Sequence, residues 1–161
     1  MTNFRVFQRR TIWRAFFFLV VIATAASGPA LGAATKLADP PPTMDQPRRI
    51  MLQLTSSDTV KQNRVLSNAI NIQKFYGIDN VEIAIIAFGP GNRALYDGED
   101  SALQTRVESL QKYGIEFTAC QNTMDATGRQ ASDLIDGVGF VRAGIAEIAE
   151  RQLKGWIYIV P

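Results

Sequence analysis

The stretch Val81–Phe88, which reads VEIAIIAF, decides the fold. Apart from Glu82 every residue in it is apolar, and isoleucine and valine favour extended backbone. A short, nearly continuous apolar run of this kind predicts a strand that is buried on both faces of a parallel sheet. Gly89-Pro90-Gly91 follows directly and predicts a turn at the end of that strand.

Working outward from this strand, short apolar runs alternate with stretches that have helical spacing. Further strands are predicted at residues 50–54, 115–119, 137–141 and 156–160. Helices are predicted from Asp58, as a cap, to about residue 76, and at residues 101–113, 122–127 and 143–153. Strands that alternate with helices imply right-handed parallel crossovers. We therefore expect an α/β fold, a three-layer α/β/α sandwich around a five-stranded, mainly parallel sheet.

The beginning of the chain has the order of a secretory signal, so residues 1–34 are predicted to be a signal peptide. Four arginines precede an apolar run at residues 15–26, and small residues follow it up to Ala34. The apolar run is shorter than the roughly 20 residues of a membrane-spanning helix. Cleavage would make the protein periplasmic, and an uncleaved signal that anchors it in the inner membrane is the alternative. The pair Arg9-Arg10 fits a twin-arginine signal as well as an ordinary Sec signal.

Residues 35–47 contain Asp39-Pro40-Pro41-Pro42 and Pro47, and this composition predicts an extended linker to a folded domain at residues 48–161. The full chain has seventeen basic and fifteen acidic residues. Without the four arginines of the signal, thirteen basic residues remain against fifteen acidic ones, which gives a formal charge of −2. A nearly neutral surface offers no electrostatic basis for nucleic-acid binding.

Residue types exclude several kinds of chemistry. The sequence has no histidine and only one cysteine, Cys120. An internal disulfide, a CxxC site, a His-ligated metal and a Ser-His-Asp or Cys-His mechanism are therefore all excluded within one chain. We expect no metal site and no cofactor, and chemistry, if present, would use Cys120, carboxylates or backbone N–H groups.

Three segments, at residues 55–58, 89–92 and 120–123, are expected at the carboxyl ends of the strands, where open parallel sheets bind ligands. Cys120 follows the third strand and precedes a helix, a position that favours the reactive thiolate, although a lone cysteine is also often a packing residue. The candidate ligand-binding residues around it are Asn122, Thr123, Gly89, Gly91, Thr55 and Ser56. Simpler roles for them are helix capping by Asn122, turn formation by Gly89 and Gly91, and capping of a helix by the loop that holds Thr55 and Ser56.

Four segments resemble the DsrE/DsrF-like family, and the likeness extends over most of residues 48–161. They are RIMLQLT at 49–55, VEIAIIAFGPG at 81–91, GIEFTACQNTM at 114–124 and GWIYI at 155–159. The resemblance implies a five-stranded parallel sandwich, assembly as a homotrimer or homohexamer, and relay of sulfur as a cysteine persulfide. In the sulfur-relay members the acceptor cysteine follows the third strand, which is the place of Cys120.

Two features depart from the best-understood members, namely the export signal and the Asn122-Thr123-Met124 sequence after the cysteine. Two functions stay open. The first is an exported sulfur carrier or sulfurtransferase-like protein, in which Cys120 takes sulfur from a donor and passes it to an acceptor protein. The second is a non-enzymatic, oligomeric binding or scaffold module in which Cys120 only packs.

Overall fold

Five strands form one parallel sheet with the order β4-β3-β2-β1-β5 in a computed structural model that describes residues 34–161. The strands are β1 (Arg48–Leu54), β2 (Val81–Ala87), β3 (Glu116–Cys120), β4 (Gly139–Val141) and β5 (Ile157–Ile159). Every neighbouring pair is parallel, with β1 and β2 paired from Arg48 with Val81 to Leu54 with Ala87. The predicted α/β architecture is confirmed.

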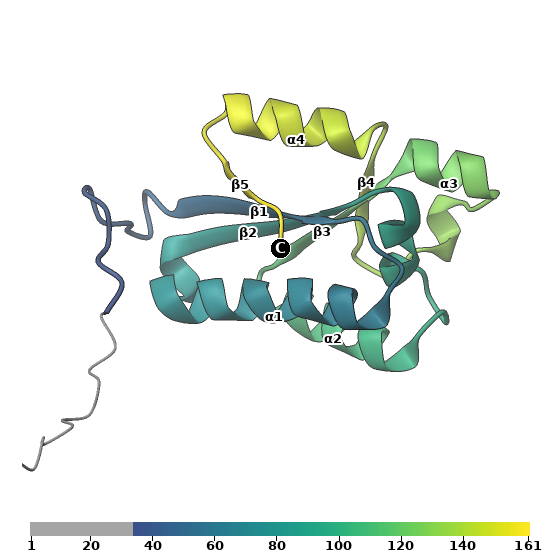
Figure 1. Cartoon of the computed structure of the whole chain (residues 1–161), viewed down its shortest axis with the longest axis horizontal. Helices are drawn as coiled ribbons and strands as arrows, with labels where there is room; N and C mark the ends of the chain where they lie inside the picture. The colour runs from purple at the N-terminus through teal and green to yellow at the C-terminus, as the bar shows by residue number, and fades with distance from the viewer. Residues whose placement is uncertain (1–33) are drawn as a thin grey trace, which may run out of the picture. The chain divides into compact units, whose positions relative to one another are not determined.

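Helices α1 (Thr59–Tyr76) and α2 (Ser101–Lys112) cover one face of the sheet and lie below it in Figure 1. Asp58 begins α1 by accepting the N–H of Lys61, and Asp100 begins α2 by accepting two N–H groups. The apolar sides of both helices pack on alternate residues of the central strands. This main core includes Leu66, Ala69, Val107, Leu110, Ile83, Ile85 and Phe117.

Helix α4 (Gly144–Leu153) lies alone on the opposite face (Figure 1). Its position follows from the topology, since the chain must return from β4 at one edge of the sheet to β5 at the other. A right-handed crossover in that direction places its helix on the face opposite to α1 and α2. The core under α4 is small, with Met51, Ala84, Ile86 and Ile148 as its buried residues.

Two short helical segments at the carboxyl ends of β2 and β3 position the candidate site. Gly89-Pro90-Gly91 does more than turn the chain, because it opens a 3-10 helix, η2 (Gly89–Leu95). After β3 the chain enters α3 (Gln121–Thr127) directly, with Cys120 at its N-cap position. Asn122 therefore lies inside the helix, and its expected role as a capping residue is wrong.

Residues 37–47 contain no helix or strand, and Arg48 holds part of this segment. Its guanidinium donates to the carbonyl oxygens of Ala38 and Pro40 at 2.8 and 2.6 Å. The predicted signal peptide lies outside the described residues, apart from Ala34. Among the helices of residues 34–161, none has the length and apolar character needed to cross a membrane.

Candidate functional site

Cys120 is the last residue of β3 and lies between the ends of two other strands. Its neighbour in the register is Val141 of β4, and Ala119 before it pairs with Ala87 of β2. Phe117 and Ala119 belong to the main core, so the alternation of side chains along the strand turns Cys120 toward the face that carries α4. The residue is buried, with 6% of its surface exposed.

N–H and hydroxyl groups at the beginnings of α3 and α4 lower the pKa of the Cys120 thiol. Burial alone would raise the pKa of the thiol. The N–H group of Gly144 and the hydroxyl and N–H of Thr123 act in the other direction, and the net pKa lies below the ordinary thiol value. The N–H of Asn122 adds to this effect, although its own hydrogen bond goes to the carbonyl oxygen of Arg142 at 3.1 Å. These groups come from the first turns of α4 and α3, so two helix beginnings contribute to stabilising a thiolate at one position.

Thr123 connects the sulfur to the end of β2. Its Oγ1 accepts the N–H of Gly89 at 2.9 Å, which leaves the hydroxyl proton available to Cys120. Gly89 has a φ of 55°, in the left-handed region that glycine adopts without strain. The sequence-predicted residues Cys120, Asn122, Thr123 and Gly89 are thus brought together.

Asn92 fixes the backbone of Cys120 and was missed as a site residue by sequence reasoning. It is buried in η2, where its Nδ2 donates to the Cys120 carbonyl at 2.9 Å and its Oδ1 accepts the Cys120 N–H at 3.3 Å. A single polar residue after a Gly-Pro-Gly turn gives no sign of this role in the sequence, because the partner is 28 positions away.

Gly144 lets α4 begin close to Cys120, and it was also missed. A Cβ at this position would lie 3.2 Å from Cβ of Phe88 and 3.4 Å from the carbonyl oxygen of Ala87. The contact with Phe88 is tighter than most Cβ contacts, so a larger residue would require Phe88 or the first turn of α4 to shift by a few tenths of an ångström. The donor that Gly144 supplies to the sulfur depends on this close approach.

The other predicted ligand-binding residues lie apart from this group. Gly91 is buried, its N–H donates to the Phe88 carbonyl at 3.2 Å, and a Cβ there would meet the Leu54 carbonyl oxygen at 2.0 Å. Thr55 and Ser56 line a different cavity of about 250 Å³ near the start of α1, together with Lys61 and Arg64. Gly91 therefore serves the packing of η2 against β1, and the structure does not join Thr55 or Ser56 to Cys120.

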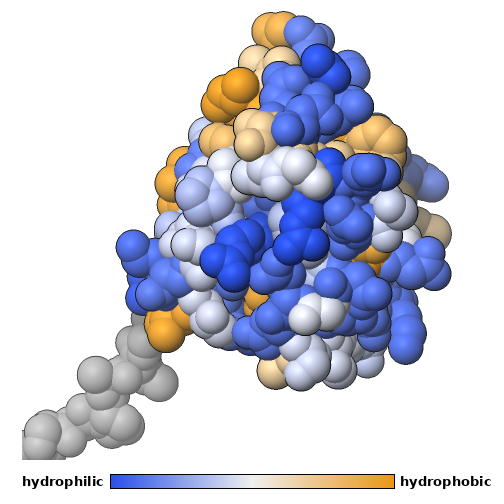
Figure 2. Space-filling view, turned by 90° about the vertical axis from the view of Figure 1, so that its right-hand side faces the viewer, coloured by the Kyte–Doolittle hydropathy of each residue, from blue (hydrophilic) through white to orange (hydrophobic). Residues whose placement is uncertain are grey.

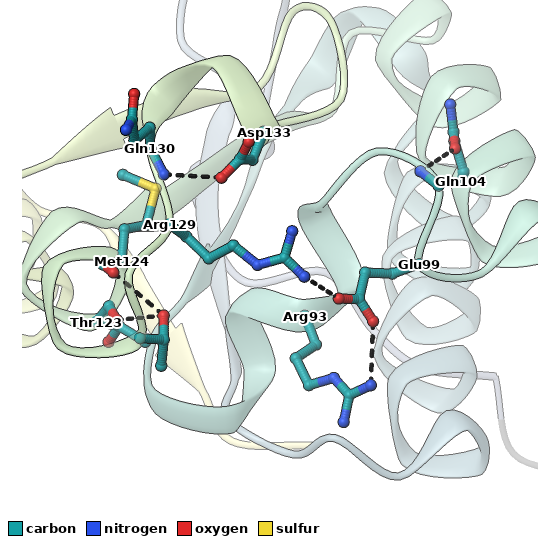
Figure 3. Close-up of polar contacts among 10 residues, drawn as sticks. Arg93, Glu99, Gln104, Thr123, Met124, Arg129, Gln130 and Asp133 are labelled. Atoms are coloured by element: carbon teal, nitrogen blue, oxygen red, sulfur yellow. Dashed lines mark hydrogen bonds and ion pairs between the residues drawn. The ribbon is translucent and has the colours of Figure 1, made fainter.

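An open cavity of about 650 Å³ lies beside the Cys120 group, between η2 and α3. Asn92, Asn122 and Thr123 form part of its wall, whereas Cys120 itself does not line it. Arg93 and Arg129 each pair with a different carboxylate oxygen of Glu99, Arg93 with Oε2 at 3.0 Å and Arg129 with Oε1 (Figure 3). Arg129 also lies over the ring of the buried Tyr96, with Cζ 4.8 Å from the ring centroid.

The surface of this end of the molecule is mixed in character (Figure 2). Hydrophilic side chains dominate the middle of the view, and hydrophobic residues gather toward its upper part, the side on which α4 lies. Within residues 34–161, no group of three or more Cys, Asp or Glu side chains is placed to hold a metal ion. Around Cys120 the described residues offer a thiol whose pKa is lowered by nearby N–H and hydroxyl groups.

The family model that matches the sequence is the DsrE/DsrF-like family, over residues 48–161. The chain belongs to the DsrE/DsrF-like family. This family is generally related to sulfur relay, and its match covers all five strands and the Cys120 group. No match to the chain was found among curated proteins.

Solved structures agree with this assignment. A protein of unknown function from Methanobacterium thermoautotrophicum, MTH1491, has a TM-score of 0.67 and 32% identity, covering 71% of this chain and 99% of its own. The ychN protein from E. coli has a TM-score of 0.60 and 18% identity, with 71% and 99% covered. BT1422 from Bacteroides thetaiotaomicron, also of unknown function, has a TM-score of 0.52 and 21% identity, with 69% and 94% covered. The last two similarities show the DsrE/DsrF-like fold alone.

Proposed function

We propose that this DsrE/DsrF-like protein is an exported sulfur carrier that holds sulfane sulfur as a persulfide on Cys120. The supporting observation is the position of Cys120 at the N-cap of α3, near the first turn of α4, where N–H groups lower the pKa of its thiol. A thiolate is the nucleophile in sulfur transfer, and the same donors would stabilise the terminal sulfur of a persulfide anion.

The transfer balances without an oxidant. The Cys120 thiolate attacks the outer sulfur of a donor R–S–SH, a new S–S bond forms on Cys120, and the donor's S–S bond breaks as R–S⁻ leaves. Because the sequence has no second cysteine, the persulfide has no internal thiol that could resolve it. Delivery therefore requires the thiol of an acceptor protein.

The experiment is mass spectrometry of the purified protein after exposure to thiosulfate, polysulfide or an organic persulfide. We expect one added sulfur atom that is removed by a reducing agent and that is absent from Cys120→Ser. If no donor adds sulfur to Cys120, or if Cys120→Ser takes up as much, the carrier function is wrong.

The burial of Cys120 favours a second candidate, an oligomeric binding or scaffold module in which this side chain only packs. The two functions differ in the rate of alkylation of the native thiol. A carrier requires alkylation at a measurable fraction of the rate found in denaturant, through opening of the turn around Gly144. A thiol that reacts only after global unfolding indicates the scaffold.

Export and assembly are part of the same proposal. The order of charged, apolar and small residues at positions 1–34 supports a cleaved signal, and the mass of the protein recovered from the periplasm tests it. Replacement of both Arg9 and Arg10 by lysine separates the two routes, since twin-arginine export would stop and Sec export would continue. The family resemblance and the exposed Ile145, Leu153 and Val160 support a homotrimer or homohexamer, which light scattering on the purified protein tests.

A further inference from the structure

The cavity between η2 and α3 has the size and lining of a small-molecule site. Its volume of about 650 Å³ lies within the roughly 300–1,000 Å³ that such sites occupy. Pro90, Ala126 and the buried Tyr96 supply apolar wall, and the charged lining residues are Arg93, Glu99 and Arg129. An inorganic donor such as thiosulfate would leave most of this space to water, so the cavity suits an organic molecule.

The charged side of the cavity has an excess of cations. Arg93 and Arg129 share the single carboxylate of Glu99, so the three side chains together carry one net positive charge. The side chain of Arg93 is 64% exposed and uses one nitrogen for Glu99, which leaves the rest of its planar fork of N–H donors free. That fork matches a carboxylate, which it can bind through two parallel hydrogen bonds.

Two residues that line the cavity also position Cys120. Thr123, which lines the cavity, is three residues after Cys120 in α3 and lowers the pKa of its thiol, and Asn92, which also lines the cavity, hydrogen-bonds the N–H and the carbonyl oxygen of Cys120. A molecule held at Arg93 would therefore share the cavity with the two residues that position Cys120. From these observations we infer that the cavity binds the sulfur donor, and that this donor is a small organic persulfide with at least one carboxylate. The inference rests on the proposed carrier function.

The first experiment measures binding alone, by calorimetry with reduced glutathione on the full chain carrying Cys120→Ser, in which no transfer can occur. We expect binding that is lost with the diethyl ester of glutathione, which lacks free carboxylates. Arg93→Gln should weaken it about three- to tenfold. Arg64→Gln is the matched control, because Arg64 is also exposed but lines the separate cavity at the start of α1, and it should bind as the parent does.

The second experiment measures sulfur uptake on Cys120 from glutathione persulfide and from inorganic polysulfide. Arg93→Gln should slow uptake from the organic donor about three- to tenfold and leave uptake from polysulfide unchanged. If both rates are unchanged, or if the ester binds as well as glutathione, the inference is overturned while the carrier function stands. If no donor loads Cys120 at all, the carrier function fails, and the assignment of the cavity to a sulfur donor fails with it.

Discussion

At the scale of single residues, Asn92 does for Cys120 what a neighbouring strand does for the residues before it. Its amide satisfies both the N–H and the C=O of Cys120, where β3 leaves the sheet. Asn92→Ala would leave these two buried groups without partners, so we expect the free energy of unfolding to fall by about 2 kcal/mol in urea titrations. Asn71→Ala, at an exposed position of α1, is the control and should change stability by less than about 0.5 kcal/mol. Equal effects of the two substitutions would contradict this role of Asn92.

The pKa of Cys120 predicts a dependence of stability on pH. Because the folded-state pKa lies below that of the unfolded thiol, the folded protein binds fewer protons between the two values. The contribution of the thiolate is complete above the unfolded-state pKa and is lost as pH falls through the folded-state pKa. Under reducing conditions, the stability advantage of the parent over Cys120→Ser should therefore be larger at pH 9 than at pH 6. A stability advantage that is equal at the two pH values, or smaller at pH 9 than at pH 6, would rule out a stabilised thiolate.

At the scale of elements, the contact of η2 with the end of β1 depends on Gly91. A Cβ at Gly91 would lie 2.0 Å from the Leu54 carbonyl oxygen, a backbone atom, so Gly91→Ala must displace η2. We expect a loss of about 2 to 3 kcal/mol in the free energy of unfolding. Gly89→Ala is the matched control, because its Cβ meets no atom within 4 Å and only the left-handed φ opposes it, at a cost of about 1 kcal/mol. If Gly89→Ala lowered the free energy of unfolding more than Gly91→Ala, the close approach to Leu54 would not be what requires glycine at position 91.

Helix α4 is joined to β3 by an ion pair that also predicts a pH effect. The hydrogen bond from Arg151 is the main cause that lowers the pKa of Glu116, and Arg151 pairs with Glu147 as well. The carboxylate thus adds stability at pH values above its unfolded-state pKa. This contribution disappears as pH falls through the lower folded-state pKa. Since the Glu116 side chain is 47% exposed, Glu116→Gln should cost only about 0.5 to 1 kcal/mol at pH 7 and close to nothing at pH 3. A cost that persists at pH 3 would contradict the ion pair as its source.

The elements themselves were largely predictable, because their apolar periodicity is strong. Each predicted strand overlaps an observed one, and Asp58 begins α1 as expected. The errors lie in short segments, where Asn122 was expected to cap a helix and Gly89–Gly91 only to turn the chain. In such segments one tertiary hydrogen bond outweighs local preference, and those bonds join positions far apart in the sequence.

At the scale of the whole molecule, the two cores on the faces of the sheet are unequal. The core under α1 and α2 holds most of the buried apolar residues, whereas α4 contributes Ile148 to a small one. Less apolar area holds α4 in place, so it should open more often than the rest of the molecule. Native-state hydrogen exchange should show faster exchange in α4 than in α1 or α2. Equal protection of the three helices would leave the buried Cys120 without this route to solvent.

The candidate site could be predicted only in part, and the reason lies in the topology. Cys120 and Thr123 were identifiable because they follow a strand at the ligand-binding edge of a parallel sheet. Arg93 and Glu99 come from the connection between β2 and α2, whereas Arg129 follows α3, and they carry no local motif, so only the folded chain shows that they meet. Gly144 was equally hidden, since it comes from the crossover between β4 and β5.

The helices that follow β3 and β4, namely α3 and α4, pack into different cores, and this arrangement affects how such a protein can change. Met124 of α3 packs into the main core and Ile148 of α4 into the small one. Arg142, just before α4, joins the two sides, because its carbonyl oxygen accepts the N–H of Asn122 at 3.1 Å and its side chain pairs with Asp125 at 3.2 Å. A change in one helix that keeps the Arg142 contacts need not disturb the apolar packing of the other. A designer could therefore alter which molecules reach the thiol by rebuilding the α3 side, and adjust how tightly it is shielded by rebuilding the α4 side, provided that the contacts of Arg142 are retained in both cases.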